Sequence, residues 1–442
     1  MGKLIIFSFL LIIAAVSCSK TEPPPTKPPA PKPEITLAQE DASVIEAWIK
    51  ITTNNIQLPA EVTLKKNNTV EQTISLLTQD SIIYIDSLLP KTNYSFQAFI
   101  HTNTQTYESN ELSVETMDTT SHNFTFQSWT FGTIGSSTLY DVAIIDENNI
   151  WAVGEIFMND SLGNPDPHVY NAVHWDGQEW KLYRIMFYSI CGQSHRTPYP
   201  AKSIFVFNKT DIWIAMDGDQ IARLNDTTQT NIMCLPFSFV INKLWGSSDN
   251  DMYAVGNNGN IAHYTNGLWT KIESGTDLNI NDIWGDYNEK AGEWEILAVA
   301  SNILQGFEKE VIKINENSAE VLSKEGIDET LSSVWFKSNR KYYVAGSGIY
   351  EKSNLNEETW KGDPLDITNY FIYKFRGVSL NDIVAAGGVG EVLHFNGSTW
   401  KSYFEEAGLN YGNYYSIFIK GNTIAVVGVD APKAAITIGT RQ

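Results

Sequence analysis

The stretch that decides the fold is Leu244–Ile272, LWGSSDNDMYAVGNNGNIAHYTNGLWTKI. It contains four short apolar runs, LW, MYAVG, IAHY and LWTKI, separated by clusters of Gly, Asn, Asp and Ser. Aromatic and β-branched residues suit a pleated, buried strand, and the polar clusters suit tight turns. We therefore predict four strands joined by three turns, with no room for a helix.

The same pattern repeats along the C-terminal three quarters of the chain. First-strand signals recur at Leu139-Tyr140-Asp141-Val142, Ser203-Ile204-Phe205, Lys243-Leu244-Trp245, Asp282-Ile283-Trp284, Ser333-Val334-Trp335, Lys374-Phe375-Arg376 and Ser416-Ile417-Phe418. Second and third strands follow each signal, and fourth strands close on Trp180, Trp269, Trp360 and Trp400. Seven four-stranded units of about 45 residues predict a seven-bladed β-propeller over residues 124–442.

The last unit lacks a fourth strand, because the chain reaches Gln442 after the third. A strand of the missing pattern, FQSWTF at residues 126–131, precedes the first unit, and its Trp129 corresponds to Trp400. We predict that this N-terminal strand completes the last unit, which removes two open sheet edges.

Residues 35–117 alternate apolar and polar side chains with period two, which predicts a β-sandwich of six or seven strands. Leu89–Phe96, LPKTNYSF, resembles the L-P-x-T-x-Y-x-F signature of fibronectin type III modules. The resemblance implies that Tyr94 forms the family's corner, that Trp48 is its buried core tryptophan, and that Ser109–Thr116 is the closing strand. The expected class is thus all-β, a fibronectin type III sandwich followed by a seven-bladed propeller.

The N-terminus predicts export. Residues 1–17 have a basic start and a short apolar run, as in a signal peptide. Ala15-Val16-Ser17-Cys18 resembles the lipobox of bacterial lipoproteins, which implies lipidation of Cys18; an ordinary secretory signal is the alternative. Residues 18–34 then form a proline-rich linker, in which the polyproline stretch Glu22–Glu34 spans about 40 Å. We expect an exported protein anchored to the cell envelope, at the outer membrane facing the periplasm or cell surface; the sequence leaves inner versus outer membrane open.

Two cysteines remain beyond Cys18, namely Cys191 and Cys234. Both follow the last strand of a repeat, and an oxidising compartment favours a disulfide between them. Two unpaired, buried thiols are the alternative. No C-x-x-C sequence occurs, so neither a redox motif nor a zinc motif is present.

The net charge of the chain limits the classes of partner that it can bind. The formal net charge is −20, so the surface repels phosphate backbones and we expect no nucleic-acid partner. We expect a glycan or an extracellular or envelope protein as partner, and contact with the membrane through the lipid alone. The oligomeric state is left open.

Binding residues are expected in the unequal loops after the second and fourth strands, which share one rim of the propeller. These loops are 155–170, 184–200, 301–310, 362–371 and 404–413. Their aromatic and charged residues suit stacking on sugars or anchoring a protein partner. The candidate binding-face residues, with one arginine from a first strand, are Tyr170, Tyr188, His195, Tyr199, Tyr370, Phe371, Arg376 and Tyr411.

No catalytic residue, metal site or cofactor is predicted. Asp166 and His168 lack a third ligand and suit a turn, and we expect the recurring His174, His263 and His394 to be packed and hydrogen-bonded. No catalytic motif occurs, although carboxylates can converge in space without one.

The chain resembles bacterial lipoproteins that join fibronectin type III modules to degenerate, BNR-like propellers. The resemblance implies a non-enzymatic, lipid-anchored envelope protein that binds or adheres through its propeller loops. Two alternatives stay open: a polysaccharide-processing glycosidase or lyase on the propeller, and a scaffold for envelope complexes.

Overall fold

The computed structural model describes residues 32–442 except 103–104, 304 and 363–366. The described chain is all-β, with one short 3-10 turn at Gly388–Gly390 and no α-helix. None of its described segments is a helix long and apolar enough to cross a membrane. The expected signal peptide (1–17), the lipidated Cys18 and most of the linker (18–34) lie outside the described residues.

The N-terminal unit consists of two sheets that share one apolar core. Its strands are β1 (Glu34–Ala42), β2 (Ala47–Asn54), β3 (Ala60–Lys66), β4 (Thr69–Leu76), β5 (Asp80–Ile85), β6 (Asn93–His101), β7 (Thr106–Glu108) and β8 (Leu112–Glu115). One sheet has the order β1-β2-β5, and the other has β4-β3-β6-β7 with β8 also paired to β6. The Tyr94 hydroxyl accepts a hydrogen bond from the Leu89 N–H at 2.8 Å, at the position where the sequence predicts a corner.

The expectation that Trp48 belongs to this core is wrong. Ala47 and Ile49 face the core of the two-sheet unit, and strand alternation therefore turns Trp48 to the outer face of β2. Trp48 is nevertheless only 2% exposed, because it packs with Trp335 and Tyr343 of the C-terminal unit.

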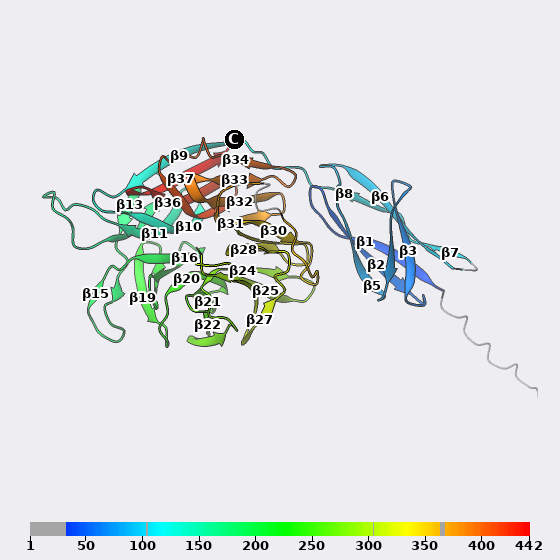
Figure 1. The fold of residues 1–442 in the computed structure, drawn as a ribbon, viewed down its shortest axis with the longest axis horizontal. Helices are drawn as coiled ribbons and strands as arrows, with labels where there is room; N and C mark the ends of the chain where they lie inside the picture. The colour runs from blue at the N-terminus through cyan, green and yellow to red at the C-terminus, as the bar shows by residue number, and fades with distance from the viewer. Residues whose placement is uncertain (1–31, 103–104, 304, 363–366) are drawn as a thin grey trace, which may run out of the picture.

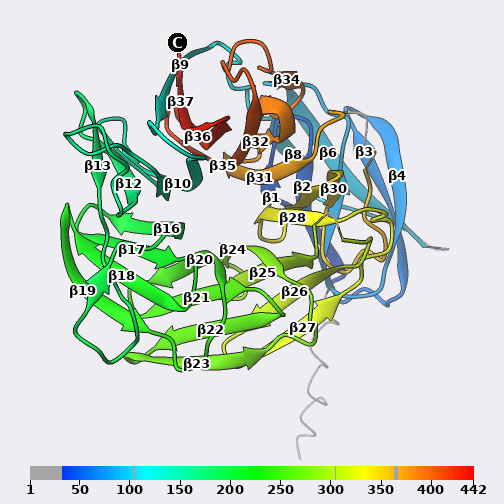
Figure 2. The ribbon, with the colours of Figure 1, turned by 60° about the vertical axis from the view of Figure 1, so that its left-hand side comes forward.

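Seven sheets follow one another in the C-terminal unit, and Figure 2 shows them fanned around an axis. Sheets 1 to 3 are β10 (Thr138–Asp146), β11 (Asn149–Ile156), β12 (Tyr170–Trp175) and β13 (Trp180–Tyr183); β16 (Ala201–Asn208), β17 (Asp211–Met216), β18 (Gln220–Asn225) and β19 (Thr228–Cys234); and β20 (Ile241–Ser248), β21 (Asp251–Gly256), β22 (Asn260–Thr265) and β23 (Leu268–Glu273). A small hairpin, β14 (Phe187–Tyr188) and β15 (Arg196–Thr197), lies between sheets 1 and 2.

Sheets 4 to 6 are β24 (Ile280–Asn288), β25 (Glu293–Ser301), β26 (Lys309–Asn315) and β27 (Ser318–Leu322); β28 (Leu331–Lys337), β29 (Lys341–Gly346) and β30 (Gly348–Lys352); and β31 (Ile372–Ser379), β32 (Asp382–Gly387), β33 (Val392–Phe395) and β34 (Trp400–Ser402). Sheet 5 corrects the prediction of a fourth strand ending on Trp360, because only the bridge between Glu351 and Lys361 forms there. Trp360 is instead buried, and its indole N–H donates to the Ser323 carbonyl at 2.9 Å.

Sheet 7 contains β35 (Gly412–Lys420), β36 (Thr423–Asp430), β37 (Lys433–Arg441) and β9 (Phe124–Phe131). Strand β9 pairs with β37 along its whole length, from Phe124 opposite Arg441 to Phe131 opposite Ala434. This is the pairing that the sequence predicts for the N-terminal strand. The first strands of successive sheets contact one another, and β35 of sheet 7 contacts β10 of sheet 1.

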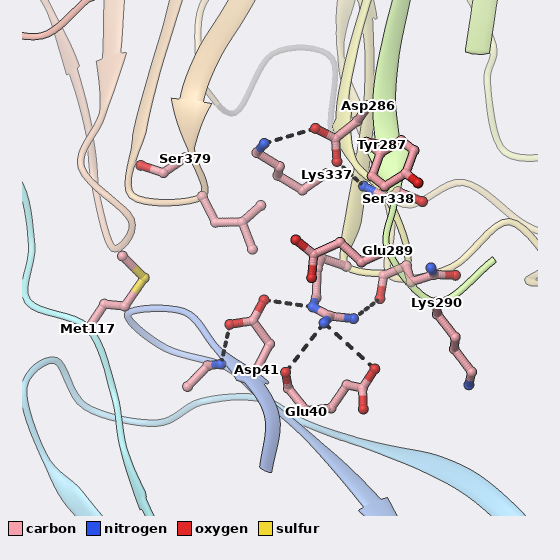
Figure 3. A pocket seen from close by; sticks show the side chains of 14 residues that line it. Glu40, Asp41, Met117, Asp286, Tyr287, Glu289, Lys290, Lys337, Ser338 and Ser379 are labelled. Carbon is pink, nitrogen blue, oxygen red and sulfur yellow. Dashed lines mark hydrogen bonds and ion pairs between the residues drawn. The ribbon is translucent and has the colours of Figure 1, made fainter. Parts of the chain in front are cut away.

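The two units lie side by side (Figure 1), and polar side chains from both meet between them (Figure 3), next to the cluster that contains Trp48; we call this contact the joint. Arg340 donates to Asp41 at 2.6 Å, and the buried Lys341 pairs with the buried Glu46 at 2.8 Å. A cleft of about 790 Å³ lies beside these pairs. Its charges are largely neutralised by one another, including Lys337 with Asp286 at 2.9 Å, so we assign the cleft to the joint.

The joint fixes which face of the C-terminal unit is covered. The N-terminal unit contacts the hairpins between the first and second strands of sheets 5 and 6, where Arg340 and Asn381 lie. Each first strand runs from the opposite face to its hairpin. The face at which the first strands begin is therefore the one turned away from the N-terminal unit.

Candidate functional site

Each of the seven first strands contains a β-bulge close to its beginning. A bulge inserts one extra residue and redirects its side chain. The bulged residues are Tyr140, Lys202, Asn242, Asn281, Ser332, Tyr373 and Tyr415. All seven line one cavity of about 380 Å³, which we call the mouth.

Three consecutive bulged residues hold neighbouring sheets together. The Asn242 amide donates to the Ile280 carbonyl at 3.0 Å, and the Asn281 amide donates to the Leu331 carbonyl at 2.9 Å. The Ser332 hydroxyl likewise donates to the Ile372 carbonyl. Each bond connects a bulge to the residue just before the next bulge, so this side of the mouth is structural.

The other four bulged residues form a continuous arc, which we call the half-rim. The ring centroids of Tyr373 and Tyr415 lie 5.1 Å apart, and those of Tyr415 and Tyr140 lie 6.3 Å apart. The Lys202 ammonium lies 4.0 Å from the centroid of the Tyr140 ring. All four side chains are half-buried.

Much of the hydrogen-bonding capacity of the half-rim is unused. The Tyr140 hydroxyl donates to Glu155 at 2.7 Å. Within the described residues, the hydroxyls of Tyr373 and Tyr415 and the ammonium of Lys202 make no hydrogen bond to protein. Burial raises the pKa of Tyr373, so its hydroxyl stays a neutral donor at physiological pH.

Directly below the mouth lies a second layer, which we call the buried ring. It contains the residue that follows each bulge, and all seven are buried: Asp141, Ser203, Lys243, Asp282, Ser333, Lys374 and Ser416. In one half, Asp141 accepts hydrogen bonds from Lys243 at 2.5 Å, Ser203 at 3.0 Å and Ser416 at 2.8 Å. The ring thereby joins first strands of different sheets.

The other half of the ring is centred on Asp282. Its carboxylate accepts from Ser333 at 2.5 Å and from Lys374 at 3.0 Å. Arg376, two residues beyond Lys374, forks onto both oxygens at 2.8 and 2.7 Å. Bidentate arginine bonds of this kind are strong and directional.

The surroundings of the two carboxylates keep them ionised. Burial alone would raise the pKa of Asp141, but the ammonium groups of Lys243 and Lys374 outweigh it and hold the pKa below its usual value. Burial opposes ionisation of Asp282 as well, and Arg376 and Lys374 outweigh it there. Removing one partner of such a buried pair is far more costly than the pair's net contribution to stability.

An apolar cavity of about 320 Å³ lies on the other side of the ring. Trp245, Trp284 and Trp294 line it, and the Arg376 guanidinium lies 5.1 Å from the Trp284 ring centroid. The buried ring thus separates a polar cavity, the mouth, from an apolar cavity.

The candidate residues of the first long loops have partners within those loops. Arg184 lies over the Tyr170 ring at 4.0 Å and pairs with Asp166. In the β14–β15 hairpin, Arg196 covers Tyr188 at 4.9 Å, and His195 Nδ1 lies 2.7 Å from the Ser189 hydroxyl. The Tyr199 carbonyl accepts from the Asn171 amide at 2.7 Å. None of these four candidates lines the mouth.

The remaining candidates are Tyr370, Phe371, Arg376 and Tyr411. Tyr370 stacks on Phe404 with centroids 5.4 Å apart, and Tyr411 is 80% exposed. Phe371 meets Tyr373 of the half-rim edge-on at 4.9 Å, while Arg376 lies within the buried ring system. Only Phe371 and Arg376 therefore adjoin the mouth. The repeated first-strand signals already contained the ring residues, which begin six of the seven signals and stand third, as Asp141, in the remaining one.

The recurring histidines are structural, as predicted. His174 Nε2 lies 2.9 Å from Asn149, His263 Nε2 lies 2.7 Å from Asp251, and His394 Nε2 lies 2.9 Å from Asp382. Each bond joins a third strand to the residue that begins the second strand.

Cys191, in the loop of the β14–β15 hairpin, and Cys234, at the end of β19, form a disulfide in the structure, with Cα atoms 6.1 Å apart. The bond ties this hairpin to sheet 2.

No protein-family model and no curated protein matches the chain. Among solved structures, "YCF48 bound to D1 peptide" is similar at a TM-score of 0.51 and 16% identity, covering 72% of this chain and 95% of that one. YCF48 from Cyanidioschyzon merolae (TM-score 0.49, 15% identity, 72% and 98% coverage) and the WD40 β-propeller domain of Doa1 (0.49, 12%, 73% and 98%) are also similar. At these identities the likeness concerns the fold alone. The chain is therefore all-β, with structural neighbours of β-propeller fold over 72% of its length and the mouth as its candidate site.

Proposed function

We propose that the chain is a lipid-anchored, non-enzymatic binding protein that holds a protein partner at the mouth. In this proposal residues 124–442 form a closed seven-bladed β-propeller, and residues 35–117 form a fibronectin type III module that carries it. The similar YCF48 structure contains a bound peptide, which supports a polypeptide as the partner class.

The half-rim carries the proposal. Asn242, Asn281 and Ser332 use their donors to join sheets, whereas Tyr373, Tyr415 and Lys202 leave theirs unused. Half-buried tyrosines beside a lysine, at the open end of a rigid ring, have the character of a binding hot spot. The face that bears them is turned away from the N-terminal unit.

The test is capture of partners from envelope extracts by the full-length chain, compared with a Tyr373→Ala/Tyr415→Ala variant. A partner retained by the wild-type chain and lost from the variant supports the proposal. Tyr411→Ala, an exposed tyrosine outside the mouth, is the matched control and should retain the partner. Equal capture by all three chains would refute binding at the mouth.

A glycan is the second candidate, because the aromatic faces of the half-rim also suit stacking on sugar rings. Catalysis on such a glycan is disfavoured by the electrostatics of the ring. Asp141 and Asp282 are buried, paired and held ionised, so neither is suited to act as a general acid. Turnover of a polysaccharide that disappears in Asp141→Asn or Asp282→Asn would overturn the non-enzymatic proposal.

Anchoring is tested at Cys18. In the proposal, Cys18→Ala moves the protein from the membrane fraction to the soluble fraction and abolishes labelling by a fatty-acid analogue. An envelope scaffold, the remaining alternative, requires two partners at once. Retention of a second partner by the Tyr373→Ala/Tyr415→Ala variant would favour it.

A further inference from the structure

The mouth carries positive charge in a strongly acidic protein. Its lining includes the three lysines Lys202, Lys243 and Lys374, but one carboxylate, Asp141. The whole chain has a formal net charge of −20. A local excess of cations against that background requires an explanation from the site itself.

The excess begins in the buried ring. Asp141 is matched by Lys243 at 2.5 Å. Asp282, by contrast, is shared between Lys374 at 3.0 Å and Arg376 at 2.7 Å. The ring and Arg376 thus hold three cations and two carboxylates, which leaves one positive charge uncompensated in a dehydrated layer.

This excess of positive charge disfavours the protonated form of Lys374. The charged groups facing it are Asp282 on β24, Arg376 on its own strand, Lys243 on β20 and Asp141 on β10, and burial outweighs the attractive ones. Burial lowers the pKa of Lys374 to about 8. An anion above the ring would stabilise its protonated form.

Lys202 adds a second positive charge in the outer layer. In the described part of the chain it forms no ion pair, and its contact is the face of Tyr140. The unused hydroxyls of Tyr373 and Tyr415 lie along the same arc and supply neutral donors. Across the mouth, Asn242 and Asn281 donate their amide N–H groups to neighbouring backbone and side-chain oxygens, so their amide oxygens are left as acceptors.

We propose that the mouth binds a carboxylate of a polypeptide, from an acidic side chain or a chain terminus, between Lys202 and the buried ring. The backbone N–H groups of the bound polypeptide, next to its carboxylate, donate to the side-chain oxygens of Asn242 and Asn281. The proposal rests on the proposed function and names the group by which the partner is held.

The test is titration of the full-length chain with labelled peptides that contain an acidic residue, its amide counterpart, or a free or amidated C-terminus. Losing a charge-assisted hydrogen bond should weaken binding about tenfold or more. The side-chain and terminal arms identify which carboxylate is used. Lys202→Met should remove the preference for the acidic peptide. Lys209→Met, at an exposed lysine in the turn after β16, should retain the preference.

The pH profile gives an independent readout. Affinity for the acidic peptide should be constant from pH 6 to 7.5 and fall above pH 8 as Lys374 loses its proton, and Lys374→Met should flatten the fall. Peptide binding at the half-rim that ignores the carboxylate and the lysines would overturn this inference and leave the proposed function standing. Binding of an acidic oligosaccharide with no peptide binding would overturn both.

Discussion

Asp282 lies between Lys374 and Arg376 and accepts hydrogen bonds from both, as well as from the Ser333 hydroxyl and the Val334 N–H. It is 0% exposed, so water cannot replace any of these partners. The negative charge of Asp282 therefore compensates two buried cations, Lys374 and Arg376.

Asp282→Asn should therefore be strongly destabilising. It leaves two buried cations without a counter-charge, and we expect a loss of about 3–5 kcal/mol in the free energy of unfolding. Urea unfolding followed by tryptophan fluorescence measures it.

The matched control for this change is Asp249→Asn. The Asp249 carboxylate pairs with Arg223, but its side chain is 60% exposed, so its loss should change stability by no more than about 0.5 kcal/mol. Equal effects of the two substitutions would contradict the role assigned to Asp282.

At the residue scale the sequence predicts the candidate site only in part. Asp141, Lys243 and Lys374 belong to strand signals that the sequence reveals, but in the sequence Tyr373 and Tyr415 look like ordinary positions before a strand. A bulge shifts the alternation by one residue, so the pattern does not show which face such a side chain takes. The loop aromatics are a different case. Tyr170 and Tyr370 pack against Arg184 and Phe404, which lie in other loops, and the sequence does not reveal which loops meet.

At the scale of the element, β9 depends on a histidine pair at its start. His122 Nδ1 lies 2.8 Å from His394 Nδ1, and His394 is tied to Asp382 together with Arg441. One ring must donate and the other accept, so the pair requires a neutral imidazole. Burial, with the positive charge of neighbours, lowers the pKa of His122 to about 4.

This arrangement predicts acid sensitivity. Because the folded pKa of His122 lies below its unfolded value, the unfolded state binds the extra proton between about pH 6.5 and pH 4. Stability is therefore unaffected above pH 6.5 and falls as the pH drops towards 4, by about 1–2 kcal/mol after allowance for the exposed part of the ring. Thermal unfolding across that range should show the fall in wild type and less of it in His122→Gln. The exposed His101→Gln should behave as wild type, and an unchanged slope in His122→Gln would refute the assignment.

The β14–β15 hairpin gives a second prediction at this scale. The disulfide closes a sequence separation of 43 residues, and its loss should reduce stability by about 2–4 kcal/mol. Thiol titration of the unfolded, non-reduced chain should find neither Cys191 nor Cys234 free. Cys191→Ser/Cys234→Ser should melt lower than wild type, and reductant should lower only the wild type. Two free thiols in the oxidised chain would favour the alternative of unpaired, buried cysteines.

The elements themselves were largely predictable, because apolar runs and turn clusters recur at regular spacing. The pairing of β9 with β37 followed from a missing strand at one end and a surplus strand at the other. Sheet 5 was mispredicted because Trp360 has the spacing of a strand residue, yet its indole fills a buried position with one isolated bridge beside it.

At the scale of the whole molecule, the sequence did not reveal the joint. A buried tryptophan such as Trp48 fits the core of the N-terminal unit and the joint equally well. One face of β2 packs in that core, and the C-terminal unit covers the other face, so residues on both faces are buried. Gly397 shows how close the approach is, because a Cβ there would lie 2.3 Å from a Val44 methyl.

The joint predicts that the two units move as one. Trp48→Ala combined with Arg340→Ala should increase the maximum dimension in small-angle X-ray scattering and expose residues 118–123 to protease. The N-terminal unit should stay folded, because neither residue belongs to its core. Phe99→Ala, on the other sheet of that unit, is the control and should leave the dimension unchanged. An unchanged dimension in the double variant would show that the joint does not set the orientation.

The joint also has a mechanical consequence for the seam between β9 and β37. A mechanical force applied to the N-terminal unit reaches the C-terminal unit through residues 118–123, directly before β9. Thr120 and Asp118 are bonded to Asn381, and Arg340 and Lys341 hold the N-terminal unit, so these contacts carry the load first. Tension that would otherwise separate β9 from β37 is thus diverted into sheets 5 and 6.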